Sequence, residues 1–124
     1  MNFEIKILVV DDFATMRRIV KGSLKQFGFN NFLEAENGKE ALSILKTEKV
    51  GLILSDWNMP DMNGLELLKA VRADPGLKGI PLIMVTAEGQ KDNILDAVKS
   101  GVSDYIMKPF TPDKLRAKIE KVLG

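Results

Sequence analysis

Apolar residues gather in five short runs along the chain, separated by longer stretches in which they recur at helical spacing. The runs cover residues 5–10, 32–34, 52–54, 82–85 and 105–107. This alternation predicts βα units built on a parallel sheet. The first, third and fourth runs are nearly continuous isoleucine, leucine and valine, as strands covered by helices on both faces require. We therefore expect these three to be central strands and the short, more polar run 32–34 to be an edge strand.

Polar residues, glycines and prolines predict where the intervening helices begin and end. Asn37 stands three residues before a glutamate, which is the pattern of a capping box, and Thr111 precedes a proline at a first helical position. Gly28 and Gly101 suit helix ends with a left-handed backbone, and Pro75 ends the helix that starts near residue 65. The loops are therefore expected to be short throughout.

The composition fits a single domain. The 124 residues, 45% of them apolar, suffice for one ordinary core, so we expect one domain over residues 1–124 and no output domain. Eighteen basic and 17 acidic side chains give a net charge of +1, without the excess typical of nucleic-acid binding. Cysteine is absent, and there is neither an apolar leader nor a run of membrane-spanning length. We expect a cytoplasmic protein that binds neither nucleic acid nor membrane.

Charged residues follow three of the apolar runs. Asp11 and Asp12 come after the first, Asp56 after the third and Lys108 after the fifth. The carboxyl ends of parallel strands meet at one edge, so three carboxylates and an ammonium are expected to converge there. Two like charges about 4 Å apart repel by about 4 kcal/mol at an effective dielectric of about 20. A chain without histidine or cysteine offers oxygen ligands, which favour Mg²⁺, and a phosphate chemistry becomes the leading hypothesis.

Each of these residues also has a purely structural interpretation. Asp12 could cap the following helix, Asp56 could be a turn residue, and Lys108 could belong to a plain turn. Thr86 could simply end a strand, although its hydroxyl and the amides after it suit phosphate oxygens. Tyr105 could be a half-buried core aromatic or a ring that moves between exposed and inward positions. The combination at one sheet edge favours a functional pocket.

The chain resembles the receiver domains of response regulators, and among them the single-domain regulators of chemotaxis. The resemblance spans nearly the whole sequence and is carried by residues 9–13, 15–18, 55–60, 65–69, 85–88 and 108–110. The aspartate pair, the later aspartate, the threonine and the lysine form the receiver pattern, while Asp-Trp-Asn-Met-Pro and Thr-Ala-Glu are typical of the chemotaxis regulators. It implies a flavodoxin-like α/β fold: one doubly wound, five-stranded parallel sheet of order 2-1-3-4-5 with five helices.

The resemblance also implies a role for each residue of the pocket. Asp56 would be the phosphoacceptor. Mg²⁺ would be held by three carboxylates and one backbone carbonyl, those of Asp11 (mostly through water), Asp12, Asp56 and Asn58. Thr86 and the backbone amide of Ala87 would bind phosphoryl oxygens, and Lys108 would pair with the acceptor and then with its phosphoryl group. Self-hydrolysis would be tuned by the flanking Asn58 and Glu88, and the peptide bond before Pro109 would be cis.

A signalling route follows from the same resemblance. The phosphoryl group, with a charge of about −1.5 to −2, would draw Thr86 inward, and the Tyr105 ring would turn inward behind it. The face that changes would be formed by Gly89, Lys91, Ile94, Val98, Tyr105, Met107 and Lys118. An apolar patch rimmed with lysines suits an acidic amphipathic peptide. Ile94 and Val98 could instead be ordinary core residues of their helix.

The partners implied by the resemblance are a chemotaxis histidine kinase as phosphodonor and the flagellar motor switch protein as target. A phosphatase is a further partner that the family allows. The alternative is a stand-alone receiver in a phosphorelay, or one that controls a non-motor partner, and Asp104 and Met107 depart from the closest chemotaxis regulators on this face. We expect a monomer that undergoes its own phosphorylation and slow self-dephosphorylation but is not otherwise an enzyme.

Two other functions of α/β proteins are disfavoured by the residues after the first strand. Phosphatases of the haloacid dehalogenase type place Asp-x-Asp there and enclose the substrate with a lid, whereas Asp11 and Asp12 are adjacent and no lid segment is evident. A flavin-binding module would need a serine- and threonine-rich phosphate loop at the same place. Sustained turnover of a small phosphomonoester, or bound flavin colour, would revive these alternatives.

Overall fold

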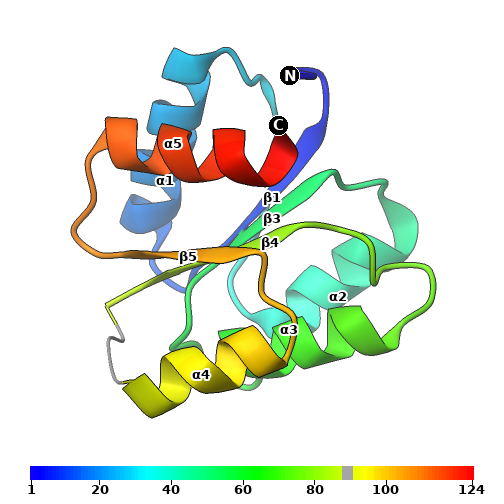
Figure 1. Ribbon diagram of the computed structural model, residues 1–124. Coiled ribbons are helices and arrows are strands. Elements are labelled where there is room, and N and C mark those ends of the chain that lie inside the picture. Colours follow the sequence, from blue (N-terminus) through cyan, green and yellow to red (C-terminus); the bar gives the residue numbers. More distant parts are fainter. Residues whose placement is uncertain (88–90) are drawn as a thin grey trace.

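The protein, represented by a computed structural model that describes residues 1–87 and 91–124, is built on one parallel sheet of order β2-β1-β3-β4-β5 (Figure 1). Its strands are β1 (Lys6–Val10), β2 (Asn31–Ala35), β3 (Leu52–Ser55), β4 (Leu82–Thr86) and β5 (Asp104–Met107). Its helices are α1 (Ala14–Phe27), α2 (Gly38–Thr47), α3 (Gly64–Ala73), α4 (Lys91–Lys99) and α5 (Pro112–Leu123). The predicted fold and strand order are confirmed, and the five apolar runs match the strands to within one residue at each end.

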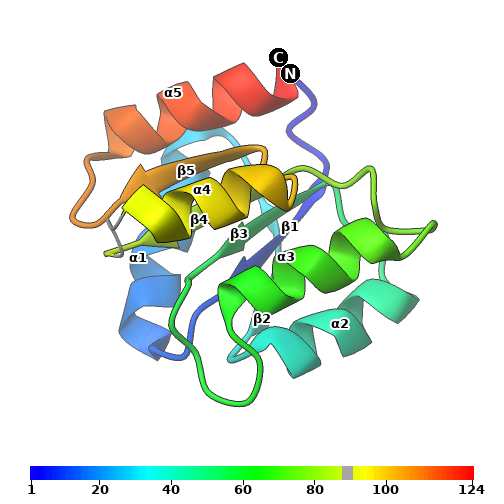
Figure 2. The ribbon, with the colours of Figure 1, turned by 60° about the horizontal axis from the view of Figure 1, so that its bottom comes forward.

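Helices cover both faces of the sheet: α1 and α5 lie on one face and α2, α3 and α4 on the other (Figures 1 and 2). Neighbouring residues of a strand point to opposite faces, so Leu8 packs toward α2 and α3, and Ile7 toward α1 and α5. The central strands β1, β3 and β4 are buried on both faces, apart from the first residue of β1. This double burial explains their unbroken runs of isoleucine, leucine and valine, while β2, half-buried and partly polar, lies at the edge as predicted.

The helix ends largely follow the predicted signals. The Thr111 hydroxyl caps α5, and the Asn37 side chain caps α2 by accepting a hydrogen bond from the Glu40 amide at 2.9 Å. The Glu40 carboxylate does not return to Asn37, so α2 has only half of the predicted capping box. A complete box instead starts α3, between Asn63 and Glu66. That box contributes about 1 kcal/mol and fixes where α3 begins, next to the site.

Two glycines have the left-handed backbone that the sequence predicts. Gly28 (φ 110°) ends α1, and Gly101 (φ 92°) follows α4. Helix α3 ends at Ala73, two residues before Pro75, also as predicted. The peptide bond between Lys108 and Pro109 is cis, as the family resemblance implies. Among the described residues, no helix has both the length and the apolar character needed to cross a membrane.

Candidate functional site

The candidate residues directly follow the carboxyl ends of the strands, and backbone hydrogen bonds fix their positions relative to one another. The backbone amide of Asp56 donates to the carbonyl of Val10 at 2.8 Å, which places the ends of β3 and β1 side by side. At the ends of β4 and β5, the Lys108 amide likewise donates to the Thr86 carbonyl at 2.8 Å. Backbone pairing thus continues past the regular strands and holds these residues at one edge.

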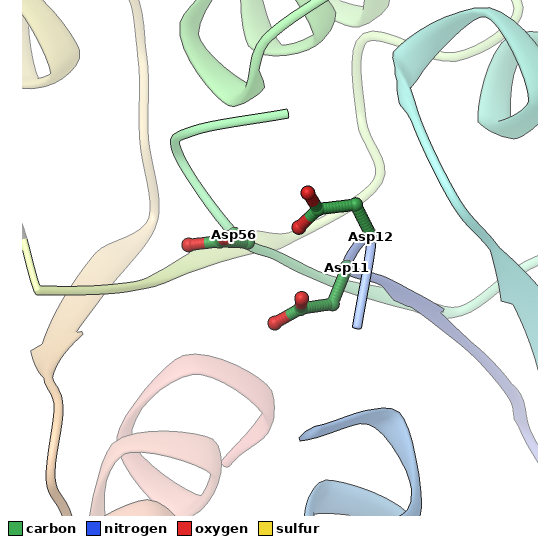
Figure 3. Close-up of side chains that lie close together, drawn as sticks. All are labelled: Asp11, Asp12 and Asp56. Carbon is green, nitrogen blue, oxygen red and sulfur yellow. The ribbon is translucent and has the colours of Figure 1, made fainter. Parts of the chain in front are cut away.

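Three carboxylates gather there, as the sequence predicts. Asp11, Asp12 and Asp56 each offer an oxygen, and these three atoms lie within 4.8 Å of one another (Figure 3). Asp11 and Asp56 are buried, with 4% and 7% of their surfaces exposed. The Lys108 ammonium lies 3.1 Å from Asp11 Oδ2 and 3.3 Å from Asp56 Oδ1. Residues that directly follow β1, β3 and β5 therefore form one charged pocket.

The charge balance of this pocket is unfavourable without another cation. Burial raises the pKa of Asp56 above its ordinary value, and the Asp11 carboxylate raises it further. The Lys108 ammonium and the Trp57 amide, which donates to Asp56 Oδ1 at 2.8 Å, lower the pKa without cancelling the rise. One ammonium thus compensates three carboxylates only in part.

Asp12 gives the most direct test of whether these residues fit a cation. Its Oδ1 atom has no contact with solvent and no hydrogen-bond partner within the described part of the chain. The residue does not cap α1, because the N-cap position is Phe13, and the Phe13 amide donates to Asp11 Oδ1 at 2.9 Å. A buried, unpaired carboxylate oxygen beside two further carboxylates fits a hard divalent cation such as Mg²⁺.

The phosphate-binding candidates lie on the same rim. Thr86 is buried at the end of β4, and Ala87, which follows it, is exposed. Asn58 is also exposed, two residues beyond Asp56. Glu88 lies outside the described residues. The arrangement provides a carboxylate, an ammonium and a hydroxyl at one edge, which together suit the transfer of a phosphoryl group to a carboxylate.

Two residues that support the pocket were not identified from the sequence. The Gly64 amide donates to the Trp57 carbonyl at 2.8 Å, and its missing side chain leaves room for the Asp56 carbonyl oxygen. Arg17 donates through Nη1 to the Asp11 carbonyl at 2.7 Å and through Nε to Glu34 at 2.9 Å. The capping-box pattern of Asn63 and Glu66 could have predicted that a helix starts at Gly64. No sequence pattern predicts the contact of Arg17 with the Asp11 carbonyl.

The predicted partner face is described only in part. Val98 and Met107 are exposed (57% and 39%), so neither belongs to the core, whereas Ile94 and Tyr105 are half-buried. Leu95, which the sequence reasoning did not select, is 43% exposed. Gly89 lies outside the described residues, and of Lys91 only its place at the start of α4 is described. A groove of about 340 Å³ runs beside this face and is lined by Tyr105, Ile106, Met107, Pro109, Lys114, Ala117 and Lys118.

We expect Asp12→Ala to weaken Mg²⁺ binding by about tenfold or more, because it removes one charged oxygen ligand from a site with few others. The variant should also be more stable than the wild type without metal, since a carboxylate oxygen with neither solvent contact nor a hydrogen-bond partner in the described part of the chain is lost. A Mg²⁺ titration followed by Trp57 fluorescence and urea unfolding in EDTA measure the two effects. Unchanged Mg²⁺ affinity would remove Asp12 from the ligand set.

The raised pKa of Asp56 gives a pH-dependent stability of definite sign. The folded protein holds this proton to a higher pH than the unfolded chain, so ionised Asp56 reduces the free energy of unfolding once the pH rises above the ordinary carboxyl value of 3.8. Without metal, Asp56→Asn should be more stable at pH 7, by on the order of 1–2 kcal/mol. The difference should narrow as the pH falls toward 3.8, and urea unfolding in EDTA at several pH values tests this.

Comparison with known proteins shows which family the chain resembles. Residues 7–120 match the family described as "Response regulator receiver domain". The chain is 54% identical over 120 residues to a chemotaxis protein CheY homolog of Campylobacter jejuni, covering 96% of this chain and 92% of that relative. It is 49% identical over 122 residues to chemotaxis protein CheY-3 of Vibrio cholerae, covering 98% and 94%.

A solved structure agrees with these relatives. The chemotaxis response regulator CheY4 of Vibrio cholerae superposes with a TM-score of 0.88 at 33% identity, over 96% of this chain and 98% of that one. A receiver domain of a histidine kinase from Syntrophus aciditrophicus also superposes with a TM-score of 0.88, at 29% identity, over 96% and 89% of the two chains. The fold and the sequence thus point to one family.

Proposed function

This chain belongs to the response regulator receiver domain family and is of the CheY type, and we propose that it is a phosphorylation switch in chemotaxis. Asp56 accepts a phosphoryl group from a histidine kinase, and the changed α4-β5-α5 face then binds the flagellar motor switch protein. The observation that carries the proposal is the pocket itself: three carboxylates that follow β1 and β3 each have an oxygen within 4.8 Å of the others, and the Lys108 ammonium lies 3.3 Å from Asp56.

The proposed transfer uses the Asp56 carboxylate as the nucleophile. One of its oxygens forms a bond to phosphorus while the bond from phosphorus to the donor's imidazole nitrogen breaks, and the electron pair stays on that nitrogen. In this proposal Lys108 pairs with the incoming phosphoryl oxygens, and the Thr86 hydroxyl donates a hydrogen bond to one of them. Asp11, Asp12, Asp56 and the Asn58 carbonyl would hold Mg²⁺, which when bound neutralises charge on the phosphoryl oxygens.

The switch resets when water takes the phosphoryl group. Water attacks phosphorus, the bond to the Asp56 oxygen breaks, and the products are inorganic phosphate and the original carboxylate. In this proposal Asn58, which is exposed and two residues beyond Asp56, tunes the rate of this step. The chain in this proposal is a signalling component with its own phosphorylation cycle, and not an enzyme acting on external substrates.

The output follows from charge and exposure on the α4-β5-α5 face. Exposed Val98 and Met107 supply apolar surface, and Lys118 supplies positive charge beside it. Phosphorylation draws Thr86 toward the phosphoryl group and lets the half-buried Tyr105 ring move inward. An acidic amphipathic helix of the motor switch suits the resulting surface. The alternative is a receiver in a phosphorelay or one with a non-motor partner.

The first test uses Trp57, the only tryptophan, which lies beside the acceptor and is 7% exposed. Its fluorescence is followed while Mg²⁺ and then acetyl phosphate are added, and intact mass reports the added phosphoryl group. We expect a metal-dependent change followed by a second, reversible change with the phosphodonor. If both additions leave the fluorescence unchanged and no mass is gained, the chain would be a receiver that works by binding alone.

A second test separates the motor from other targets. The affinity of a peptide from the amino-terminal segment of a motor switch protein is measured with and without acetyl phosphate and Mg²⁺. Phosphorylation should tighten binding. No change would reject the motor as target while leaving the phosphoacceptor proposal intact. The proposal places the chain in the cytoplasm as a monomer, with a phosphatase as an additional partner.

A further inference from the structure

Asp104, the first residue of β5, is a buried carboxylate that faces α5. Its Oδ1 atom accepts hydrogen bonds from the Tyr105 amide at 2.8 Å and from the Lys118 ammonium at 3.0 Å. Its Oδ2 atom lies 3.4 Å from the Lys121 ammonium but has no hydrogen-bond partner in the described part of the chain and no contact with solvent. Only 9% of the residue is exposed, so this carboxylate depends on the two lysines.

Lys118 joins this carboxylate to the ring of Tyr105. Its ammonium lies 5.4 Å from the centre of that ring, which is within the range of a cation–π contact. Asp104 thus holds Tyr105 in two ways, through the backbone amide and through the lysine above the ring. Burial raises the pKa of Asp104, but the Tyr105 amide, Lys118 and Lys121 outweigh that effect and hold the pKa below its usual value. The carboxylate is therefore charged at neutral pH.

The same lysine borders the groove beside β5 and α5. That groove is also lined by Tyr105, Met107 and Lys114. An acidic helix bound there would draw Lys118 toward its own carboxylates. Asp104 would then lose its closest cation while remaining shielded from water, which is costly for a buried carboxylate. The exposed pair between Glu48 and Lys6 carries no such cost, since its two side chains are 40% and 44% exposed.

We propose that Asp104 is an intramolecular competitor for the acidic partner, holding Lys118 over Tyr105 and lowering the affinity of the unphosphorylated face. The inference rests on the proposed output of this face and adds a residue that sets its affinity and specificity. An inward move of the Tyr105 ring removes one of the two contacts of Lys118, so phosphorylation would loosen this hold. Asp104 is a positioning residue: it acts on the partner through Lys118 and Tyr105.

The test compares wild type with Asp104→Asn and Asp104→Ala, and uses Glu48→Gln as a matched control far from this face. Two synthetic amphipathic helices serve as probes, one with glutamates along its polar edge and one with glutamines there. Fluorescence anisotropy gives the affinity of each, with and without acetyl phosphate and Mg²⁺. Circular dichroism shows which variants are folded. If Asp104→Asn does not fold, Asp104→Ala provides the comparison with wild type.

We expect both Asp104 variants, unphosphorylated, to bind the glutamate peptide about three- to tenfold more tightly than wild type. The gain should shrink at high salt, and binding of the glutamine peptide should not change. Glu48→Gln should behave as wild type. Equal or weaker binding of the glutamate peptide by the variants, or equal gains for both peptides, would overturn the inference.

A second measurement needs no partner. Peptide mass spectrometry gives the rate at which an amine-reactive reagent modifies Lys118. The rate should rise several-fold in the Asp104 variants, and an unchanged rate would show that Asp104 does not restrain this lysine. The proposed output fails separately if phosphorylated wild type gains no affinity for the glutamate peptide. If it does gain affinity and the variants match wild type, only the inference about Asp104 fails.

Discussion

Asp56→Asn is expected to carry no phosphoryl group after incubation with acetyl phosphate and Mg²⁺, a loss on the order of a thousandfold or more in the rate of incorporation. An amide oxygen is a far weaker nucleophile than a carboxylate, while its shape leaves the packing of this buried position unchanged. Intact mass measures the incorporation directly. Trp57 fluorescence, which should respond to phosphodonor only in the wild type, measures it independently.

The control for this prediction is Asp61→Asn, in the loop between β3 and α3. Asp61 has a left-handed backbone (φ 67°), which asparagine adopts as readily as aspartate, and it is not among the three clustered carboxylates. The Asp61→Asn variant should therefore be phosphorylated to the same extent as the wild type. Incorporation that persists in Asp56→Asn would place the acceptor at another residue, which fragmentation of the labelled chain would locate.

The outline of the fold and the convergence at the sheet edge were predictable because both depend on local patterns. A strand buried on two faces needs an unbroken apolar run, and parallel strands must bring their carboxyl ends to one edge. The convergence of Asp11, Asp56 and Lys108 therefore follows from the sequence pattern. The strand order itself needed the family resemblance, because periodicity does not determine which strands are neighbours.

Contacts that depend on side-chain packing were not predictable. The pair between Lys108 and Asp56 that the family resemblance implies is present at 3.3 Å, but the additional, slightly shorter contact of the same ammonium with Asp11, at 3.1 Å, was not predicted. The capping role considered for Asp12 was an equally reasonable local pattern, and only the position of its side chain decides against it. The sequence marks Asp104 as a departure from related proteins, but not its partner. The pairing with Lys118 joins β5 to α5 across a helix–sheet interface, which sequence spacing does not define.

Gly64→Ala is expected to reduce the free energy of unfolding by about 3 kcal/mol, because a methyl group there has no free space. It would collide with the Asp56 carbonyl oxygen and lie 2.8 Å from Met84 Sδ. A side chain can move aside, but this carbonyl belongs to the backbone that positions the acceptor. To fit the methyl group, the start of α3 must shift away from the end of β3.

The matched control is Gly22→Ala, at an exposed position of α1 where an added methyl group meets nothing within 4 Å. Alanine should stabilise that helix by about 0.5–1 kcal/mol, so the two variants differ in sign for the same chemical change. Urea unfolding followed by Trp57 fluorescence measures both. Gly64→Ala should also bind Mg²⁺ more weakly, because the backbone around Asp56 moves. Equal stability of the two variants would mean that α3 can shift without cost, and Gly64 would then have no part in positioning Asp56.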